Sequence, residues 1–280
     1  MKLITIIITL LFCSNAVLTQ ELELIGPPGG FVRSIGINPL NPNTIYTGQS
    51  GLFERSYDGG ENGYPIFNNF QNQSVHQIVI PDTDTNIIFA SISSGAIKSS
   101  NRGKDWESIH QSSAHLFDIQ FKLNPLNNDI IYMNVEGREL WRSNNRGKDW
   151  FLLYQFEYIS MGLRLRSFDI AKTDTSIMYA GSGGKIYKST NSGSNWFMTH
   201  DNSVSHGTIR EIKINPQNPN SFYFIRSSYS LMKSEDGGKT FNYLDAFLKY
   251  QLHPSDTLIL YGTISLDRKS TRLNSSHGII

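Results

Sequence analysis

The sequence predicts an all-β protein, a β-propeller built from four-stranded blades. One short polar motif recurs five times at nearly even spacing, and a second turn motif precedes each copy. The segments between them are short runs that alternate apolar and polar residues, and none shows a helical period. Four short strands in about 44 residues are typical of one propeller blade. We therefore expect five full blades and part of a sixth.

The recurring motif reads Ser-x-Asp/Asn-x-Gly, with an aromatic residue three positions after the glycine in four copies. Its serines are 43–46 residues apart. The members are Ser56, Asp58 and Gly60; Ser99, Asn101, Gly103 and Trp106; Ser143, Asn145, Gly147 and Trp150; Ser189, Asn191, Gly193 and Trp196; and Ser234, Asp236, Gly238 and Phe241. The first copy lacks the aromatic residue, so we expect an altered turn there.

Each copy lies between two short strand-like runs, which indicates a hairpin turn. An Asp or Asn side chain can accept a hydrogen bond from the backbone just after it, and Gly tolerates the left-handed conformation. Asn replaces Asp in three copies. The motif therefore does not require a negative charge, and we interpret these residues as structural.

A second turn, often of the form Asn-Pro-x-Asn, precedes each copy of the motif. It occupies residues 37–42, 80–84, 123–127, 171–174 and 214–219. An apolar, β-branched or aromatic segment follows each of these turns, at residues 44–46, 87–89, 130–132, 176–179 and 221–224. These segments supply the second strand of each predicted blade, and the motif closes the hairpin between the third and fourth strands.

The N-terminal residues 1–20 have the pattern of a secretory signal peptide. One lysine, Lys2, precedes an apolar run at 3–12, and small residues follow at 14–16. The run is too short to span a bilayer. We expect a secreted protein with no other membrane segment. The single cysteine, Cys13, lies in this segment, so the exported part has no disulfide.

The C-terminal residues 267–277 read DRKSTRLNSSH, which is the in-frame translation of a short-read sequencing adapter. We therefore expect residues 267–280 to be an artefactual tail. The propeller would then occupy residues 21–266 and be incomplete.

The composition excludes several classes of partner. The formal net charge is only +1, and 18% of the residues are charged. A balance this even is not the electrostatic signature of a protein that binds nucleic acid or an acidic membrane. No motif indicates a cofactor or a metal site, so we expect neither.

The starts of the innermost strands carry the candidate site. In alignment they read Arg33-Ser34, His76-Gln77, Phe117-Asp118, Phe168-Asp169 and Arg210-Glu211. On this alignment Asp118, Asp169 and Glu211 converge at one mouth of the channel, near Arg33, His76 and Arg210. Converging carboxylates perturb one another's pKa values and can bind a cation or sugar hydroxyls. The alternative, which we favour for the carboxylates, is that each caps a strand end or pairs with a neighbouring blade.

The recurring motif resembles the Asp-box, or BNR, repeat of sialidases, sortilin-type receptors, xyloglucan-cleaving glycosidases and photosystem-assembly propellers. The resemblance covers residues 26–245 and implies a propeller fold. Residues 26–53 are similar to the first blade of the xyloglucan-cleaving enzymes, but Gln49-Ser50 stands where those enzymes have an Asp. Arg33 is placed like the first arginine of sialidases, yet Ser34-Ile35 replaces the Ile-Pro expected after it. The resemblance therefore implies no complete catalytic set.

Three functions are consistent with these residues. We expect a secreted, non-enzymatic propeller that binds a protein or carbohydrate ligand at the channel mouth. A fragment of a glycoside hydrolase, of xyloglucanase or sialidase type, and the ectodomain of a sortilin-like ligand receptor are the alternatives. The loops expected to recognise the ligand are residues 49–50, 91–94, 136–138, 182–184 and 226–228.

Overall fold

The computed structural model contains five four-stranded antiparallel sheets and one two-stranded sheet among its described residues. These residues are 32–66, 73–111, 119–156, 165–201, 208–226, 229–246, 249–252 and 260–263. The predicted signal peptide, the predicted tail and Asp118 lie outside them. Within these ranges no helix is long and apolar enough to cross a membrane. The predicted all-β class and blade count are confirmed.

Each four-stranded sheet is one blade, and its strands follow one another in chain order. Blades 1 and 2 consist of β1 (Ser34–Ile37), β2 (Ile45–Gly48), β3 (Phe53–Ser56), β4 (Tyr64–Pro65), β5 (Val75–Val79), β6 (Ile88–Ile92), β7 (Gly95–Ser99) and β8 (Glu107–Gln111). Blade 3 consists of β9 (Gln120–Leu123), β10 (Ile131–Val135), β11 (Glu139–Ser143) and β12 (Phe151–Gln155). Blade 4 consists of β13 (Leu165–Ile170), β14 (Met178–Ser182), β15 (Lys185–Ser189) and β16 (Phe197–Asp201). Blade 5 consists of β17 (Ile209–Ile214), β18 (Phe222–Arg226), β19 (Ser230–Ser234) and β20 (Asn242–Ala246), and β21 (Lys249–Leu252) with β22 (Leu260–Thr263) forms the two-stranded sheet.

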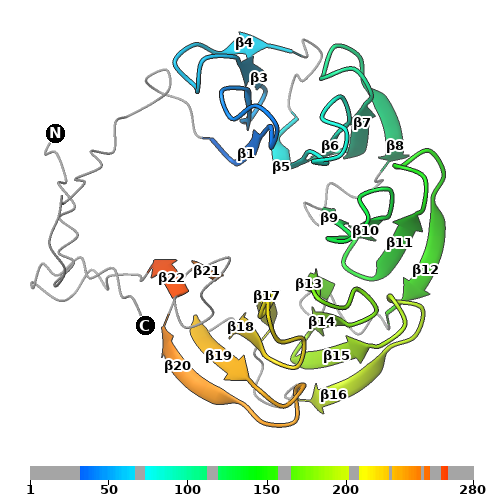
Figure 1. The fold of residues 1–280 in the computed structure, drawn as a ribbon, viewed down its shortest axis with the longest axis vertical. Helices are drawn as coiled ribbons and strands as arrows, with labels where there is room; N and C mark the ends of the chain where they lie inside the picture. The colour runs from blue at the N-terminus through cyan, green and yellow to red at the C-terminus, as the bar shows by residue number, and fades with distance from the viewer. Residues whose placement is uncertain are drawn as a thin grey trace, which may run out of the picture.

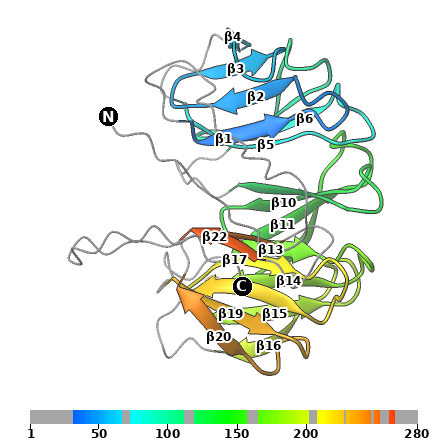
Figure 2. The ribbon, with the colours of Figure 1, turned by 60° about the vertical axis from the view of Figure 1, so that its left-hand side comes forward.

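The blades are arranged around a common centre like an open fan (Figure 1). The first strand of each blade lies nearest the centre, and the fourth lies at the outer rim. Turned by 60°, the sheets lie one above another, and their turns gather at two faces (Figure 2). Antiparallel pairing places the turns after the first and third strands at one face and the loops after the second strands at the other.

The hydrophobic core is divided into layers between successive blades. Tyr46 and Phe53 of blade 1 pack against Val75 and Ile78 of blade 2. Comparable layers join blade 2 to blade 3, blade 3 to blade 4, and blade 4 to blade 5. A further layer places Tyr250 of β21 against blade 5. Each blade therefore buries its faces against its neighbours, as a repeat architecture requires.

The recurring motif forms the same turn in all five blades. In each turn the Ser Oγ accepts a hydrogen bond from the Gly N–H, at 2.8 or 2.9 Å. The same hydroxyl donates to the Asp or Asn Oδ1, at 2.6–3.1 Å. That Oδ1 accepts from the backbone four residues further on. Asn and Asp act identically here, as the sequence predicts. Blade 1 keeps these bonds, and its difference lies in a fourth strand of two residues.

The residue before the motif glycine is also left-handed, a feature that the motif does not predict. It is Gly59 in blade 1 and Gly237 in blade 5. In the other three blades it is a non-glycine residue, with φ of 61° at Arg102, 59° at Arg146 and 57° at Ser192. This turn also contacts the preceding blade, because the Tyr46 hydroxyl and the Arg55 guanidinium both donate to the Arg102 carbonyl. The turns therefore help hold one blade against the next.

Candidate functional site

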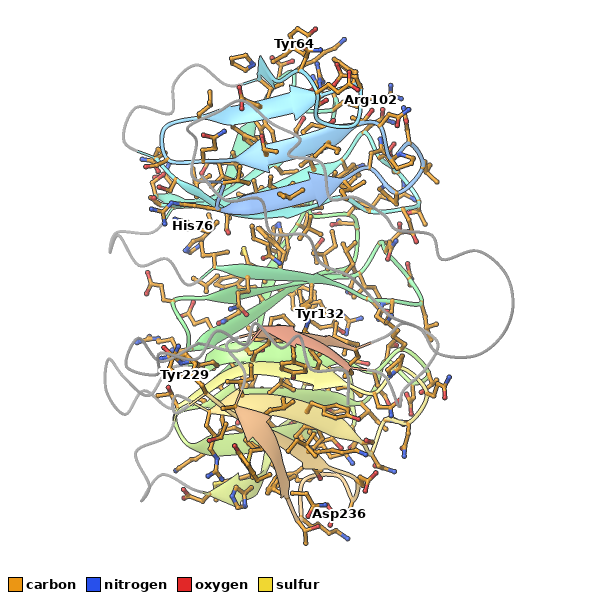
Figure 3. All side chains as sticks on the ribbon, turned by 90° about the vertical axis from the view of Figure 1, so that its left-hand side faces the viewer. Tyr64, His76, Arg102, Tyr132, Tyr229 and Asp236 are labelled. Atoms are coloured by element: carbon orange, nitrogen blue, oxygen red, sulfur yellow. The ribbon has the colours of Figure 1, made fainter. Side chains whose placement is uncertain are left out.

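The starts of the innermost strands and the loops after the second strands share one face of the ring, which we call the mouth face. The recurring turns lie at the other face, which we call the turn face. Figure 3 shows this division, with His76 and Tyr229 on one side and Arg102 and Asp236 on the other. Of the sequence-predicted site residues that the structure describes, Arg33, His76, Arg210 and Glu211 lie at or beside the starts of innermost strands.

A β-bulge marks the start of the innermost strand in three blades. The pairing register shifts between Val75 and Gln77, between Leu165 and Ser167, and between Ile209 and Glu211. The residues left over are His76, Arg166 and Arg210. Bulges redirect a side chain away from the regular alternation of a strand, and they are frequent beside binding sites. Basic residue types therefore occupy the bulge in all three blades.

Blade 1 presents a comparable residue, Arg33, directly before β1. Gly48 is the register partner of Ser34, and the Gly48 carbonyl also accepts a hydrogen bond from the Arg33 N–H at 2.8 Å. Two residues of this segment, Arg33 and Ser34, therefore lie opposite Gly48. The Arg33 side chain is exposed. Burial lowers the pKa of the half-buried His76, and the positive charge of Arg33 lowers it further. This coupling indicates that Arg33 and His76 lie near each other.

Arg210 and Tyr229 form the aromatic part of the mouth face. The Arg210 guanidinium carbon lies 4.8 Å from the centre of the Tyr229 ring. Tyr229 has a φ of 62° and is 38% exposed. A cation over an aromatic face is a favourable contact, and it orders both side chains. An arginine head group and an exposed ring edge are therefore held together beside the start of β17.

The loops of the mouth face are hydrogen-bonded to the starts of innermost strands. The Gln49, Gly137 and Gly183 carbonyls accept hydrogen bonds from the first residues of β5, β13 and β17. In the loop of blade 2, the Ser93 hydroxyl accepts from the Ser74 N–H at 3.0 Å and lies 3.3 Å from His76 Nε2. These bonds fix the loops before any ligand arrives, which lowers the entropic cost of binding.

The predicted alignment of the carboxylates was wrong for Asp169. Strand pairing places Ser34, Gln77, Gln120, Ser167 and Glu211 at one level. Asp169 lies two residues further along its strand, at the level of Lys122 and Lys213. Each of these three residues is the register partner of a tyrosine in the second strand of its own blade. The error arose because the bulges are not visible in the sequence. The correct level lies three residues before the last residue of the innermost strand, which is Ile37, Leu123, Ile170 or Ile214. Counting back from these residues also identifies Arg166 as the residue just before that level in blade 4.

The described carboxylates of the predicted site already have partners. Asp169 Oδ1 lies 3.1 Å from Lys122 Nζ, and its Oδ2 accepts from the Ile214 N–H at 2.8 Å. Glu211 Oε1 lies 3.2 Å from Lys213 Nζ. Both pairs involve innermost strands, and the Asp169 contacts join three neighbouring blades. The described part of the chain contains no group of three or more His, Cys, Asp or Glu residues able to hold a metal ion.

Comparisons with known proteins place the fold. No family model matches the sequence, and no curated protein matches it either. A glycoside hydrolase family 74 enzyme from Niastella koreensis is similar in structure, with a TM-score of 0.61, 14% identity, 82% of this chain covered and 43% of that one. The family 74 xyloglucanase from Xanthomonas campestris gives a TM-score of 0.60 with the same identity and coverages. A chain of a nidogen–laminin complex gives 0.53, at 12% identity, covering 78% of this chain and 80% of that one.

At these identities the likeness shows the fold alone, and the fold is that of a β-propeller. The chain spans less than half the length of the two family 74 structures.

Proposed function

We propose that this chain is a secreted, non-enzymatic β-propeller that binds a protein or a glycan at its mouth face. The basic residue types at the starts of the innermost strands carry the proposal: Arg33, His76 and Arg210 come from three blades, and the Arg33 and Arg210 side chains are exposed. Loops that are already hydrogen-bonded surround them. Binding residues are often carried by loops on a rigid scaffold, and the repeated blades supply that scaffold.

The occupied carboxylates support a binding role over hydrolysis. A glycosidase needs two carboxyl groups that exchange protons with, or attack, the substrate. Both oxygens of Asp169 are engaged by Lys122 and by a backbone N–H, and Glu211 is paired with Lys213. Gln49, which stands where the resemblance to xyloglucan-cleaving enzymes implies an Asp that acts as the catalytic base, is buried and donates to Glu54 at 3.2 Å. The glycoside hydrolase alternative would depend on Asp118 and on residues beyond these.

The structural neighbours are compatible with either type of ligand. One is named a xyloglucanase, and another belongs to a protein–protein complex. The signal peptide predicted at residues 1–20 supports secretion. Expression of the full chain in a secreting host, followed by N-terminal sequencing of the exported product, tests that part of the proposal.

The function itself is tested with two panels. The purified chain is applied to a glycan array and to a peptide array, and in parallel it is incubated with xyloglucan and sialyl-lactose. We expect saturable binding on one array and no release of reducing sugar or sialic acid. Hydrolysis that is lost in Asp118→Asn while the melting temperature is kept would establish the enzyme instead. No binding on either array and no hydrolysis would overturn the proposed function.

A further inference from the structure

Blade 1 carries two tyrosines at positions where the other blades have no such pair. Tyr57 directly follows the motif serine, and Tyr64 begins β4 as the register partner of Arg55. The residues that follow the motif serine in blades 2–5 are polar, namely Ser100, Asn144, Thr190 and Glu235. The residues at the position of Tyr64 in those blades are Glu107, Phe151, Phe197 and Asn242. The recurring turn therefore forms without two tyrosines, and their presence in blade 1 needs another reason.

The two tyrosines, which we call the tyrosine pair, lie against each other and face outward. Their ring centres are 6.2 Å apart, and the ring planes are inclined by 47°. Tyr57 is 55% exposed and Tyr64 is 54% exposed. In blades 2 and 4 the aromatic residue instead folds back over its turn, where Trp106 and Trp196 donate to the carbonyl of the motif glycine. Singly exposed rings need no explanation, but adjoining rings form a continuous apolar patch, which can mark a binding site.

Hydrogen bonds and a stacked arginine hold the tyrosine pair in place. The Arg55 guanidinium carbon lies 4.6 Å from the centre of the Tyr57 ring, and Arg55 Nη1 donates to the Arg102 carbonyl at 2.6 Å. In the turn between the tyrosines, the Asp58 carboxylate accepts from the Asn62 N–H at 2.9 Å and from the Asn62 side chain at 2.7 Å. An ordered surface loses less conformational entropy on binding than a mobile one.

The charges of this turn disfavour an anionic ligand. Asp58 and Glu61 are both exposed. Among the described residues, no nitrogen of a Lys, Arg or His side chain lies within 4 Å of either carboxylate. The cation beside the rings, Arg55, already contacts Tyr57 and the Arg102 carbonyl. A nucleic acid or an acidic polysaccharide would therefore approach two carboxylates that no ion pair neutralises.

The geometry of the rings decides among the remaining ligands. Proline-rich peptides bind in grooves lined by aromatic rings, and the two rings lie too close together to leave a groove between them. A methylated ammonium group binds over an aromatic face, and Arg55 already takes that position over Tyr57. A sugar ring with equatorial hydroxyls has a flat C–H face, which suits the exposed surface of a tyrosine. Within the described ranges, the two tyrosine hydroxyls and the Glu61 carboxylate have no hydrogen-bond partner, so they are available to sugar hydroxyls.

We propose that the tyrosine pair is a second binding site, which takes a neutral oligosaccharide of β-linked hexoses. Two successive sugar rings would stack on Tyr57 and Tyr64, and the inclination of the rings suits a chain that twists between one sugar and the next. Figure 3 shows Tyr64 at the edge of the molecule, away from His76 of the mouth face. The site is therefore independent of the mouth-face proposal, and a protein that binds its partner there would be able to hold a polysaccharide at the same time.

The test uses the ¹⁵N-labelled full chain, with cellopentaose as the probe in an NMR titration. The backbone amide of Gly63 reports binding, because it lies next to Tyr64 and is unchanged in every variant. We expect its signal to shift saturably. Tyr57→Ala and Tyr64→Ala should each weaken binding roughly two- to tenfold, the size of one aromatic contact, and together they should abolish the shift. Tyr57→Phe with Tyr64→Phe keeps both rings and should still saturate the signal.

A matched pair of variants separates this site from exposed aromatic surface in general. Phe151→Ala with Phe197→Ala removes two rings of 43% and 50% exposure from the position of Tyr64 in blades 3 and 4, and it should leave the shift unchanged. Arg33→Ser with Arg210→Ser should also leave it unchanged, which keeps the result separate from the mouth face. The melting temperature of each variant checks that it is folded.

Three results would overturn the proposal. The first is no saturation by cellopentaose, and the second is equal binding by the wild type and the tyrosine-to-alanine pair. The third is a shift of the Gly63 signal by pentaproline or tri-galacturonate in place of cellopentaose. A dimer in light scattering that the tyrosine-to-alanine pair abolishes would likewise overturn it, since a second copy would then cover the rings.

Discussion

Replacing Gly147 by alanine should destabilise the protein strongly, because this glycine lies against the preceding blade. Gly147 has a φ of 71°, and a Cβ added there would lie 2.6 Å from Phe89 Cε1 and 2.8 Å from Phe89 Cζ. Phe89 is fully buried and its ring packs against Phe121, with 5.5 Å between ring centres. The ring therefore has little room to move away.

Gly59 is the matched control for the backbone term. It has a similar φ of 77°, and nothing lies within 4 Å of an added Cβ. Gly59→Ala should therefore cost only the left-handed conformation, roughly 1–2 kcal/mol. Gly147→Ala should cost that amount and about 1–3 kcal/mol more for the overlap.

The assay is thermal unfolding followed by tryptophan fluorescence. Each kcal/mol lowers the melting temperature by roughly 2–4 °C in a protein of this size. The melting temperature of Gly147→Ala should therefore lie about 2–12 °C below that of Gly59→Ala. Equal melting temperatures would refute the reasoning, because they would show that the turn of blade 3 does not press on blade 2.

Three further predictions concern the turns and the mouth face. Ser192→Gly should stabilise the protein by up to about 1 kcal/mol and so raise its melting temperature, because glycine removes the left-handed strain at φ 57°. A lower melting temperature in a calorimetric scan would contradict this. Hydrogen bonds from Ser56 and Asn62 hold the pKa of Asp58 well below the usual 3.8, and hydrogen bonds from Thr240 do the same for Asp236. The stability that these carboxylates contribute should thus be present above about pH 4 and be lost as the pH falls further, and Asp58→Asn with Asp236→Asn should flatten the acid side of a urea-unfolding profile. In an NMR titration His76 should titrate below 6.5, and Arg33→Gln should raise its pKa without restoring 6.5, since burial is the larger cause; an unchanged pKa would mean that the two residues are not neighbours.

The sequence predicted those parts of the fold that depend on local chemistry. The Ser-x-Asp/Asn-x-Gly turn requires a hydroxyl, an acceptor and a left-handed glycine at fixed offsets, so Ser99, Asn101 and Gly103 could be identified without a structure. The length between turns then fixed four strands for each blade. The left-handed Arg102 and Ser192 were missed because nothing in their side chains favours that conformation.

The candidate site was less predictable, because its geometry depends on register. The bulges at His76 and Arg210 result from how the innermost strand meets its neighbour, and the residue types alone do not specify them. The sequence alignment consequently placed Asp169 at the level that Ser167 occupies, two residues from its true position. The preferred interpretation was that each carboxylate caps a strand end or pairs with a neighbouring blade. Asp169 does pair with Lys122 of the neighbouring blade, whereas Glu211 pairs with Lys213 of its own strand. Tyr229 was missed because its contact with Arg210 crosses between loop and strand.

Equilibrium binding at the mouth face tests the central claim most directly. The strongest array ligand is titrated against the wild-type chain, against Arg33→Ser with Arg210→Ser, and against Lys148→Ser with Lys239→Ser. The second pair removes the same charge from exposed positions in the recurring turns of the opposite face. We predict that the arginine pair raises Kd at least about tenfold, or about 1.4 kcal/mol, while the lysine pair stays within about twofold of the wild type. Equal weakening by both pairs would contradict binding at the mouth face.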